Sequence, residues 1–429
     1  MREMKKVNVL VYGSGGRENA LAFKISQSPL LNKLFLALPS DGFKNLAEEI
    51  IFSDFEELAQ RCVENKIDLA IIGPEEPLSK GIVDVLNGYG IKCIGANKKW
   101  AKLESSKKYA KEFMEKHKIP TAKYFVVNSN EEIEKTLENF SNHPVLKADG
   151  LAAGKGVHLS SDMQDAKNTL EEFLGGKWGD ASRDVVVEER LEGEELSIIS
   201  VYDGQTLLSF VPARDYKRLN DGQTGPNTGG MGAYCPVQLS YEQDYELQKY
   251  LKQLEGALIS EEADFVGIIY SGLMLTKDGI KVLEYNMRFG DPETQALMCH
   301  LGCDILEIFI NATEKKLAQT NLKWKGGTSI CVVVASDGYP QTPKKGCQIN
   351  GAKEAVQKYG TQIFYAGVKS ENKKLLSNGG RVLNVCSSGN DIKKVRERIY
   401  ETIEEIDFSD KIYRKDIGAS AHRIELVTK

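Results

Sequence analysis

Short apolar runs alternate with helical patterns in the first part of the chain, and this alternation constrains the fold more than any other feature. The runs lie at residues 7–12, 33–38, 69–72 and 92–94. Strands that alternate with helices predict a parallel sheet with helices packed on both faces. The sequence is therefore expected to begin with a doubly wound α/β domain, over about residues 1–104.

Glycine-containing turns follow two of these runs. Gly13-Ser14-Gly15-Gly16-Arg17-Glu18 follows the first, and Gly73-Pro74-Glu75 follows the third. Parallel strands end at one edge of their sheet, so both turns should lie where such folds bind ligands. Glu18 stands where the dinucleotide fingerprint has its third glycine, which disfavours a nicotinamide or flavin enzyme. A small phosphate-bearing ligand fits the first turn, and a βα turn without a ligand is the alternative.

Three polar residues alternate with apolar ones after the apolar run 280–283. They are Glu284, Asn286 and Arg288. Strand alternation places their side chains on one face, and charged groups are rarely buried unless they are paired or bind a metal. The oxygens of Glu284 and Asn286 suit Mg²⁺, and the planar fork of Arg288 suits an anion. An exposed edge strand is the competing interpretation.

The middle of the chain carries lysines and glycines in a pattern that suits a nucleotide. A short strand delivers Lys147, and the loop after it contains Gly154-Lys155-Gly156. This is not a Walker A loop, because Gly156 replaces the hydroxyl residue that would hold Mg²⁺. A glycine loop that closes over a nucleotide as a lid fits better.

Two further segments belong to the same pattern. The strand at 185–188 runs into acidic residues, where backbone groups could contact an adenine edge and a carboxylate could hold ribose hydroxyls. A solvated acidic turn is the alternative. The segment 225–232 contains four glycines and follows Asp215 and Lys217. A linker is less expected there than a functional turn, because charged residues and a later strand pair flank it.

Composition excludes several classes of protein. The chain has 429 residues, 41% of them apolar and 27% charged, with a net charge of −5. Nothing indicates a nucleic-acid or membrane-surface binder, which would show a basic excess. No apolar run approaches the ~18 residues of a membrane span, and the first residues do not form a secretory signal. A cytoplasmic protein with free thiols is expected, since its eight cysteines form no CxxC motif.

Taken in order, these segments resemble the ATP-grasp superfamily and, within it, the phosphoribosylamine–glycine ligase family. The resemblance covers essentially the whole chain, and the stretches at 225 and 288 are its most specific parts. The matching segments are residues 13–18, 73–75, 103–107, 147–156, 225–232, 288–295, 378–383 and 414–418.

The resemblance implies an architecture and a reaction. An α/β domain (1–104) would precede an ATP-grasp domain (105–328, with a lid near 122–195) and a small α+β domain (329–429). ATP would phosphorylate the carboxylate of glycine, and the amine of 5-phosphoribosylamine would attack the acyl phosphate, as in purine biosynthesis. ATP and Mg²⁺ or Mn²⁺ are the implied cofactors. The implied partners are small molecules, with no nucleic acid or membrane, and the chain would be a monomer or a weak homo-oligomer.

The resemblance also assigns roles to individual residues. ATP would contact Lys107, Lys147, Gly154, Lys155, Gly156, Glu188, Glu189, Leu191 and Glu195. Glu284 and Asn286 would hold the metal. Arg288 and Lys155 would act in catalysis, by stabilising the transferring phosphoryl group and covering the triphosphate. Substrates would contact Gly13, Gly15, Gly16, Arg17, Glu18, Gly73, Pro74, Glu75, Asp215, Asp291 and Glu293.

Two departures from the family pattern lie on the sugar-phosphate side. Asn19 stands where members usually have His, and Pro39-Ser40-Asp41-Gly42 replaces a Pro-Gly-Asn-x-Gly turn. Asp41 adds a negative charge that would be unfavourable near a phosphate unless it is offset. Neutral drift is one explanation, and a different phosphorylated amine is another. A catalytically silent nucleotide-binding protein is a further alternative.

Overall fold

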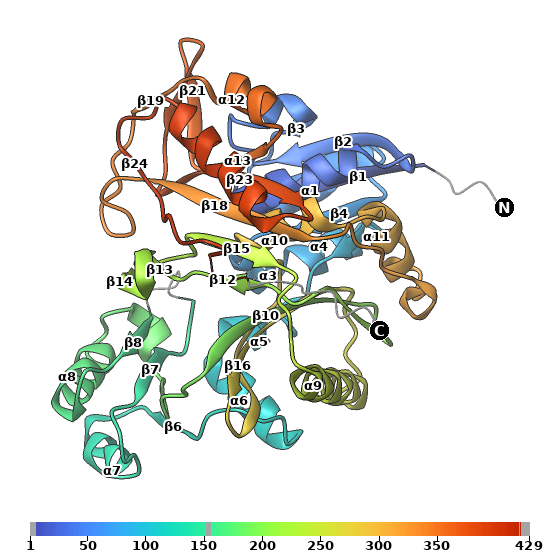
Figure 1. Cartoon of the computed structure of the whole chain (residues 1–429). Helices are drawn as coiled ribbons and strands as arrows, with labels where there is room; N and C mark the ends of the chain where they lie inside the picture. The colour runs from blue at the N-terminus through green and yellow to red at the C-terminus, as the bar shows by residue number, and fades with distance from the viewer. Residues whose placement is uncertain (1–5, 152–155, 420, 422–429) are drawn as a thin grey trace.

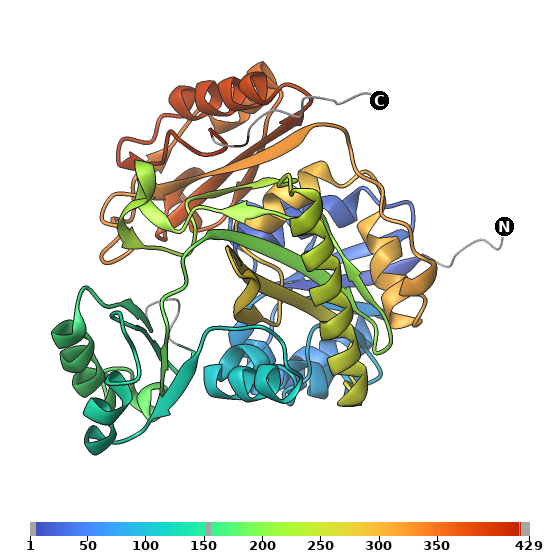
Figure 2. The same ribbon diagram turned by 60° about the horizontal axis from the view of Figure 1, so that its bottom comes forward.

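The computed structural model describes residues 6–151, 156–419 and 421. Four larger sheets form its frame, and Figure 1 shows how they are arranged. The N-terminal and C-terminal sheets lie together, and the central sheet lies below them in that view. The lid sheet projects to one side, and Figure 2 shows it standing apart from the rest of the molecule.

The N-terminal sheet has five parallel strands in the order β3-β2-β1-β4-β5. This confirms the doubly wound domain that the alternating runs predict. Its strands are β1 (Val7–Tyr12), β2 (Leu31–Ala37), β3 (Glu48–Ile50), β4 (Leu69–Ile72) and β5 (Lys92–Ile94). Its helices are α1 (Gly16–Ser26), η1 (Lys44–Leu46), α2 (Phe55–Glu64), α3 (Glu75–Lys80) and α4 (Ile82–Gly88), and α5 (Lys102–Ser105) and α6 (Lys107–Lys116) follow.

The lid sheet is antiparallel, with the order β6-β9-β7-β8. It has its own hydrophobic core, which includes Leu146, Leu170 and Val187. A body with a separate core can move without breaking the main core. Its elements are β6 (Tyr124–Val127), η2 (Asn130–Glu132), α7 (Ile133–Leu137), β7 (Val145–Ala148), β8 (Val157–Leu159), α8 (Met163–Leu174), η3 (Gly179–Ser182) and β9 (Val185–Glu188).

The central sheet is antiparallel, with the order β11-β10-β16-β17. Its strands are β10 (Glu194–Tyr202), β11 (Leu207–Ser209), β16 (Gly267–Thr276) and β17 (Gly279–Asn286). The hairpin of β13 (Arg218–Asn220) and β14 (Thr224–Asn227), with η4 (Asp221–Gln223) at its turn, lies near it. The accompanying helices are α9 (Tyr241–Ser260), α10 (Glu293–His300), α11 (Ile305–Thr313) and η5 (Leu317–Gln319).

The C-terminal sheet has the order β12-β15-β18-β23-β20, with β24 paired to β18. Two of its strands, β12 (Arg214–Asp215) and β15 (Gly232–Cys235), come from the middle of the chain, so this sheet joins segments far apart in sequence. The others are β18 (Thr328–Ser336), β20 (Gln362–Tyr365), β23 (Arg381–Gly389) and β24 (Lys411–Ile412). A small sheet of β19 (Gln348–Ile349), β22 (Lys374–Ser377) and β21 (Val368–Glu371) and the helices α12 (Ala352–Tyr359) and α13 (Ile392–Glu405) complete the expected α+β unit.

The described part of the chain contains no helix that is both long enough and apolar enough to cross a bilayer. All eight cysteines are free thiols, as their spacing predicts.

Candidate active site

β17 presents a polar face, as the sequence alternation predicts. Tyr285 and Met287 are buried, whereas Glu284, Asn286 and Arg288 are partly exposed. Nη2 of Arg288 donates a 3.1 Å hydrogen bond to Oδ1 of Asn286. The carboxylate, the amide and the guanidinium are therefore neighbours on one side of the strand.

Glu284 lies where several cations converge. Burial raises the pKa of Glu284, but the nearby positive charges outweigh burial and lower this pKa to about 2. These charges are, in order of strength, Lys217, Lys107, Lys147 and Arg288. The carboxylate is consequently ionised at neutral pH and is a hard oxygen ligand in a site rich in counter-charges.

Arg288 is fixed by two carboxylates from the N-terminal part of the chain. Its Nη2 lies 3.1 Å from Oε1 of Glu104, and its Nε lies 3.4 Å from Oε2 of Glu75. Glu104 is buried and also accepts a 2.7 Å hydrogen bond from the amide of Met287. Burial lowers the pKa of Arg288, but the two carboxylates more than offset burial and raise it. The sequence reasoning missed Glu104, although it lies in a segment that carries the resemblance.

A buried group that we call the lysine-rich cluster consists of Lys111, Lys147 and Glu188. Nζ of Lys147 lies 3.0 Å from Oε2 of Glu188 and donates a 2.9 Å hydrogen bond to the carbonyl of Leu283. Nζ of Lys111 lies 3.2 Å from Oε1 of the same carboxylate. The cluster connects the lid strands β7 and β9 to β17, which carries Glu284. Lys111 was absent from the residues expected from sequence.

Some of the other residues expected at the nucleotide lie near this cluster, and others lie outside the described residues. Oε1 of Glu189 lies 3.1 Å from Nζ of Lys281, and Leu191 is half-buried. Gly154 and Lys155 lie outside the described residues. Gly156 is buried, and its carbonyl accepts a 2.8 Å hydrogen bond from the amide of Ala148. Lys107 follows the N-cap Ser106 of α6.

The first glycine turn is tied together by Glu18. Oε2 of Glu18 accepts a 2.7 Å hydrogen bond from the amide of Gly15, and Oε1 lies 2.5 Å from Nε of Arg17. A Cβ at Gly13 or Gly73 would collide with the Glu18 side chain, so both glycines are required by close packing. Glu18 thus occupies the space between the two turns.

The same turns reach the polar face of β17. Nη1 of Arg17 donates a 3.0 Å hydrogen bond to the carbonyl of Phe289. Burial opposes ionisation of Glu75, but Arg288 and Arg17 outweigh it and lower the pKa of this carboxyl. The neighbouring Pro74 lies against Gly13, and a Cβ at Gly16 would collide with Asn384. The N-terminal turns and β17 therefore form one site.

A second charged group, which we call the acid-rich cluster, consists of Asp215, Glu293, Glu195 and Lys217. Nζ of Lys217 lies 3.2 Å from Oε2 of Glu195. Burial raises the pKa of Asp215 to about 8; Lys217 acts in the opposite direction, while Glu293 and Glu195 act with burial. Three carboxylates thus share a single lysine within the cluster.

Glu293 is held in place by hydroxyl groups of the central sheet. Its Oε1 accepts a 3.1 Å hydrogen bond from Oγ of Ser197, which lies 2.9 Å from the hydroxyl of Tyr270. A Cβ at Gly290 would lie 2.5 Å from Oε2 of Glu293. A side chain at this glycine would therefore displace the carboxylate.

Asp291 connects the central part to the C-terminal sheet. Nη1 of Arg381 lies 3.2 Å from Oδ1 of Asp291, and it donates hydrogen bonds to the carbonyls of Asp291 (2.7 Å) and Gly229 (2.8 Å). Burial opposes ionisation of Asp291, but Arg381 and Arg17 lower the pKa of the carboxyl. Arg381 therefore holds the glycine stretch against the residues that follow β17.

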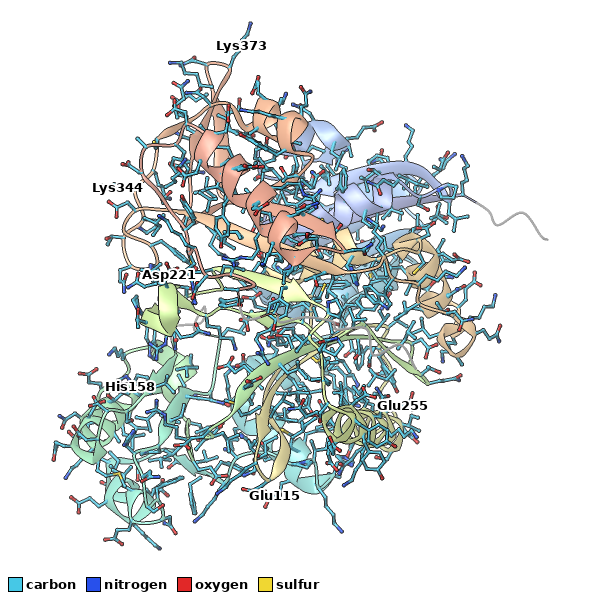
Figure 3. All side chains as sticks on the ribbon, in the orientation of Figure 1. Glu115, His158, Asp221, Glu255, Lys344 and Lys373 are labelled. Carbon is cyan, nitrogen blue, oxygen red and sulfur yellow. The ribbon has the colours of Figure 1, made fainter. Side chains whose placement is uncertain are left out.

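The β13–β14 hairpin is held by a segment near the end of the chain. Arg414 is buried, and its Nη1 donates to the carbonyl of Arg218 at 2.9 Å. Oδ2 of Asp416 accepts a 2.9 Å hydrogen bond from the amide of Gly222. Asp221, labelled in Figure 3, accepts from the amide of Lys415 at 2.8 Å. These contacts give the 414–418 motif a role in positioning the hairpin.

Both departures from the family pattern contact the C-terminal part of the chain. Oδ1 of Asn19 accepts a 2.7 Å hydrogen bond from the amide of Tyr365. Asp41 lies 2.7 Å from Nζ of Lys44 and accepts a 2.6 Å hydrogen bond from the amide of Ser370. The side-chain hydrogen bond from Lys44 and the amide of Ser370 lower the pKa of Asp41. The negative charge of Asp41 is thus offset within the protein.

Two oxygen donors that suit a metal lie on one face of β17. Among residues 6–151, 156–419 and 421, no group of three or more His, Cys, Asp or Glu side chains is arranged to hold a metal ion. Glu284 and Asn286 offer two oxygens of the hard type, and Mg²⁺ usually completes such a shell with phosphate oxygens and water. The residues present therefore fit a cation shared with a nucleotide.

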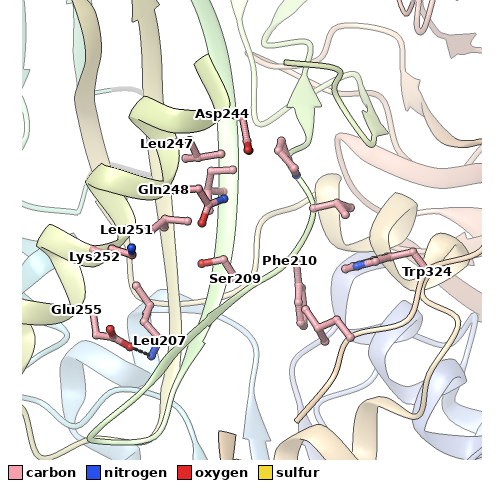
Figure 4. Close-up of a pocket in the computed structure, with 14 residues that line it drawn as sticks. Leu207, Ser209, Phe210, Asp244, Leu247, Gln248, Leu251, Lys252, Glu255 and Trp324 are labelled. Carbon is pink, nitrogen blue, oxygen red and sulfur yellow. Dashed lines mark hydrogen bonds between the residues drawn. The ribbon is translucent and has the colours of Figure 1, made fainter. Parts of the chain in front are cut away.

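A cavity of about 420 Å³ lies away from these residues (Figure 4). Leu247 and Leu251 of α9, Leu207 of β11 and Trp324 line it. β11 is the edge strand opposite to β17, so this cavity does not belong to the candidate site.

Family comparisons cover the whole architecture. Sequence models of the phosphoribosylglycinamide synthetase N domain, ATP-grasp (A) domain and C domain match residues 7–104, 105–294 and 329–420. The phosphoribosylamine–glycine ligase of Mesorhizobium japonicum is 42% identical over 97% of this chain and 98% of its own length. The ligase of Caulobacter vibrioides is 41% identical with the same coverage.

Solved structures agree with this result. The crystal structure of phosphoribosylamine–glycine ligase from Thermotoga maritima matches 96% of this chain and 100% of its own, with 32% identity and a TM-score of 0.83. The biotin carboxylase domain of Hydrogenobacter thermophilus 2-oxoglutarate carboxylase, solved with MgADP, shares the fold at 15% identity and a TM-score of 0.71. The chain belongs to the phosphoribosylglycinamide synthetase family of ATP-grasp ligases.

Proposed function

We propose that the chain joins glycine to 5-phosphoribosylamine with the consumption of ATP, and that its two charge clusters bind opposite ends of the reacting complex. Family membership over the full length favours this reaction over a different amine acceptor or a silent nucleotide-binding protein. Both nucleophiles come from the substrates, so no side chain needs to form a covalent bond.

Lys147 of the lysine-rich cluster and Lys107 are assigned to the phosphates of ATP. Lys147 lies at the end of a lid strand and beside β17, where it can reach a nucleotide held between the lid and the central sheet. The segment 188–191 would contact adenine, and Glu195 would accept from the ribose hydroxyls. Gly154, Lys155 and Gly156 would cover the triphosphate.

Arg288, Glu284 and Asn286 are assigned to phosphoryl transfer. Glu284 and Asn286 would hold Mg²⁺ or Mn²⁺, which supplies charge neutralisation on the phosphate oxygens when bound. Arg288 keeps its charge in its ion pairs with Glu104 and Glu75. A fixed guanidinium beside the reacting phosphoryl group stabilises negative charge that develops in the transition state.

Asp215 and Glu293 of the acid-rich cluster are assigned to the ammonium group of glycine. Asp215 has a pKa of about 8 in the unliganded protein, because burial and neighbouring carboxylates disfavour its charge. An incoming ammonium group would reverse this balance and favour the ionised carboxylate. Glu293 and Asp291 would complete this substrate region, and the turns at 13–18 and 73–75 would face the sugar phosphate.

The convergence of four cations on Glu284 is the observation that carries the proposal, because an ionised carboxylate surrounded by three lysines and an arginine supports a site for phosphates and a divalent cation. The direct test is ADP release from ATP in the presence of glycine and phosphoribosylamine, with Mg²⁺ or Mn²⁺. Turnover that requires both substrates and a divalent cation is expected. Background turnover with normal ATP binding would refute the assignment of the amine acceptor.

A cytoplasmic location and a monomeric or weakly associated state stay predictions. Light scattering of the purified chain over a range of concentrations would measure the state of association.

A further inference from the structure

Lys111 is a buried lysine to which the reaction above assigns no role. It lies on α6 and is 1% exposed. Its Nζ lies 3.2 Å from Oε1 of Glu188 and donates a 2.7 Å hydrogen bond to Oγ1 of Thr121. Lysine is almost never fully buried unless it is paired, so this position needs an explanation.

The two oxygens of Glu188 are divided between two lysines. Lys147 is 3.0 Å from Oε2, and Lys111 is 3.2 Å from Oε1. The side chains of all three residues are between 2% and 7% exposed. Two positive charges and one negative charge leave the cluster with a net positive charge, and its burial limits screening by solvent.

Lys147 has one donor left for an external acceptor. An ammonium group has three N–H donors. Two of those of Lys147 are directed to Glu188 and to the carbonyl of Leu283. With Lys111 taking the other oxygen of Glu188, the charge of Lys147 is only partly neutralised.

We propose that Lys111 is a positioning residue for ATP, which shares Glu188 with Lys147 and so preserves the positive charge that Lys147 offers to the phosphates. This inference rests on the proposed role of Lys147 in binding ATP. Without Lys111, Glu188 and Lys147 would form a closed, neutral pair with less attraction for a polyanion.

A purely structural role for Lys111 is the competing explanation. Oγ1 of Thr121 donates a 2.7 Å hydrogen bond to the carbonyl of Val282, so Lys111 also helps to connect α6 with β17. A structural role would lower the melting temperature of a variant without a specific dependence on charge.

The test measures the affinity of the full-length chain for ATP and ADP by calorimetry. Lys111→Met should weaken binding about tenfold, because one buried unit charge is lost near the phosphates. Lys111→Arg should stay near the wild type. Lys116→Met is the matched control, since Lys116 is on the same helix, 66% exposed and paired with Glu261. The control should bind as the wild type does.

A double variant separates charge from structure. Lys111→Met combined with Glu188→Gln removes one charge of each sign and returns the net charge of the cluster to its original value. It should bind ATP more tightly than Lys111→Met alone. If removal of the second polar partner weakens binding further, the structural explanation holds and the inference is wrong.

A pH profile provides a second, independent readout. Lys111 faces Glu188 of β9 and Glu189 just after that strand, Lys147 of β7 and the ring of Tyr124 of β6. Burial lowers the pKa of Lys111 to about 8. ATP affinity of the wild type should therefore fall above pH 8, whereas Lys111→Arg should lose less affinity over the same range.

The outcomes are distinct. A wild type that does not bind ATP would refute the proposed function. A wild type that binds, together with a folded Lys111→Met variant of equal affinity, would overturn the role of Lys111 alone. If Lys111→Met does not fold, Lys111→Arg is the deciding variant. The inference is wrong if the ATP affinity of Lys111→Arg falls above pH 8 as steeply as that of the wild type.

Discussion

The lysine-rich and acid-rich clusters carry unbalanced charge of opposite sign. The first is buried throughout, whereas the second is buried at Asp215 and Glu293 and partly exposed at Glu195 and Lys217. In the first, Lys111 and Lys147 share Glu188. In the second, Asp215 and its carboxylate neighbours share Lys217. Burial moves the pKa of Lys111 down to about 8 and that of Asp215 up to about 8. Each cluster thus contains a group whose charged form burial disfavours.

The difference between the clusters explains how one site can bind glycine, which is a zwitterion, and ATP, which is a polyanion, in a fixed orientation. Unbalanced buried charge costs free energy until a ligand of opposite charge arrives. A triphosphate suits the first cluster, and the ammonium group of an amino acid suits the second. Glu284 lies between them, since Lys217 from one cluster and Lys147 from the other both lower its pKa.

The largest effect is expected where the two clusters meet. Glu284→Gln should reduce the rate of ADP formation about 10³-fold, because it removes a metal ligand beside the transferring phosphoryl group. Steady-state turnover at saturating Mg²⁺ is the measurement. Asp278→Asn, at the exposed turn between β16 and β17, should behave as the wild type. Unchanged turnover of Glu284→Gln would contradict this arrangement, because phosphoryl transfer would then not take place between the two clusters.

The second-largest effect is expected at Asp215, and it tests whether the two clusters bind different ligands. Asp215→Asn should raise KM for glycine roughly tenfold to hundredfold, because the ammonium group loses its buried counter-charge. The affinity for ATP should change little. Initial rates at varied glycine concentration measure KM, and calorimetry with ADP measures the affinity for the nucleotide. An equal loss for both ligands would show that the two clusters act as one.

A smaller effect concerns stability and pH. The pKa of Asp215 is raised to about 8 in the folded protein, from a usual value near 3.8. The folded state therefore binds more protons than the unfolded state between these values, and stability from this group falls as pH rises from about 4 to 8. The melting temperature of Asp215→Asn relative to that of the wild type should increase between pH 6 and 8.5. A constant difference would contradict a buried, neutral Asp215.

The smallest effect is expected outside both clusters. Asp41→Asn should change KM for the amine substrate by less than about twofold, because Lys44 and the amide of Ser370 already offset the charge of Asp41. Kinetics with varied phosphoribosylamine provide the measurement. A large decrease in KM for phosphoribosylamine would show that Asp41 repels the sugar phosphate. It would then support the hypothesis of a different amine acceptor.

Local sequence patterns predicted much of the fold and part of the candidate site. Alternation alone placed Glu284, Asn286 and Arg288 on one face, because a strand has a period of two. The strand β3 was missed, since it has three residues and two of them, Glu48 and Glu49, are exposed. The run expected at 33–38 became β2 at Leu31–Ala37, a shift at its ends only.

Local sequence patterns did not predict the ion pairs between residues that lie far apart in the chain. Lys111 lies among other lysines of α6, and nothing local distinguishes it from Lys116, which is exposed. Its burial follows from Glu188, which lies on a lid strand far along the chain. Glu104 likewise gains its role from Arg288. Charge pairs of this kind depend on how the domains pack, which periodicity does not encode.

The pairing of β15 with β18 has a consequence for synthesis on the ribosome. β15 lies between β12 and β18, and β18 begins only at Thr328. The nascent chain therefore carries an unpaired strand edge until synthesis reaches the last quarter of the chain. Chains that stop early would expose this edge and its buried side chains, so the C-terminal segment protects the earlier parts from aggregation as well as completing them.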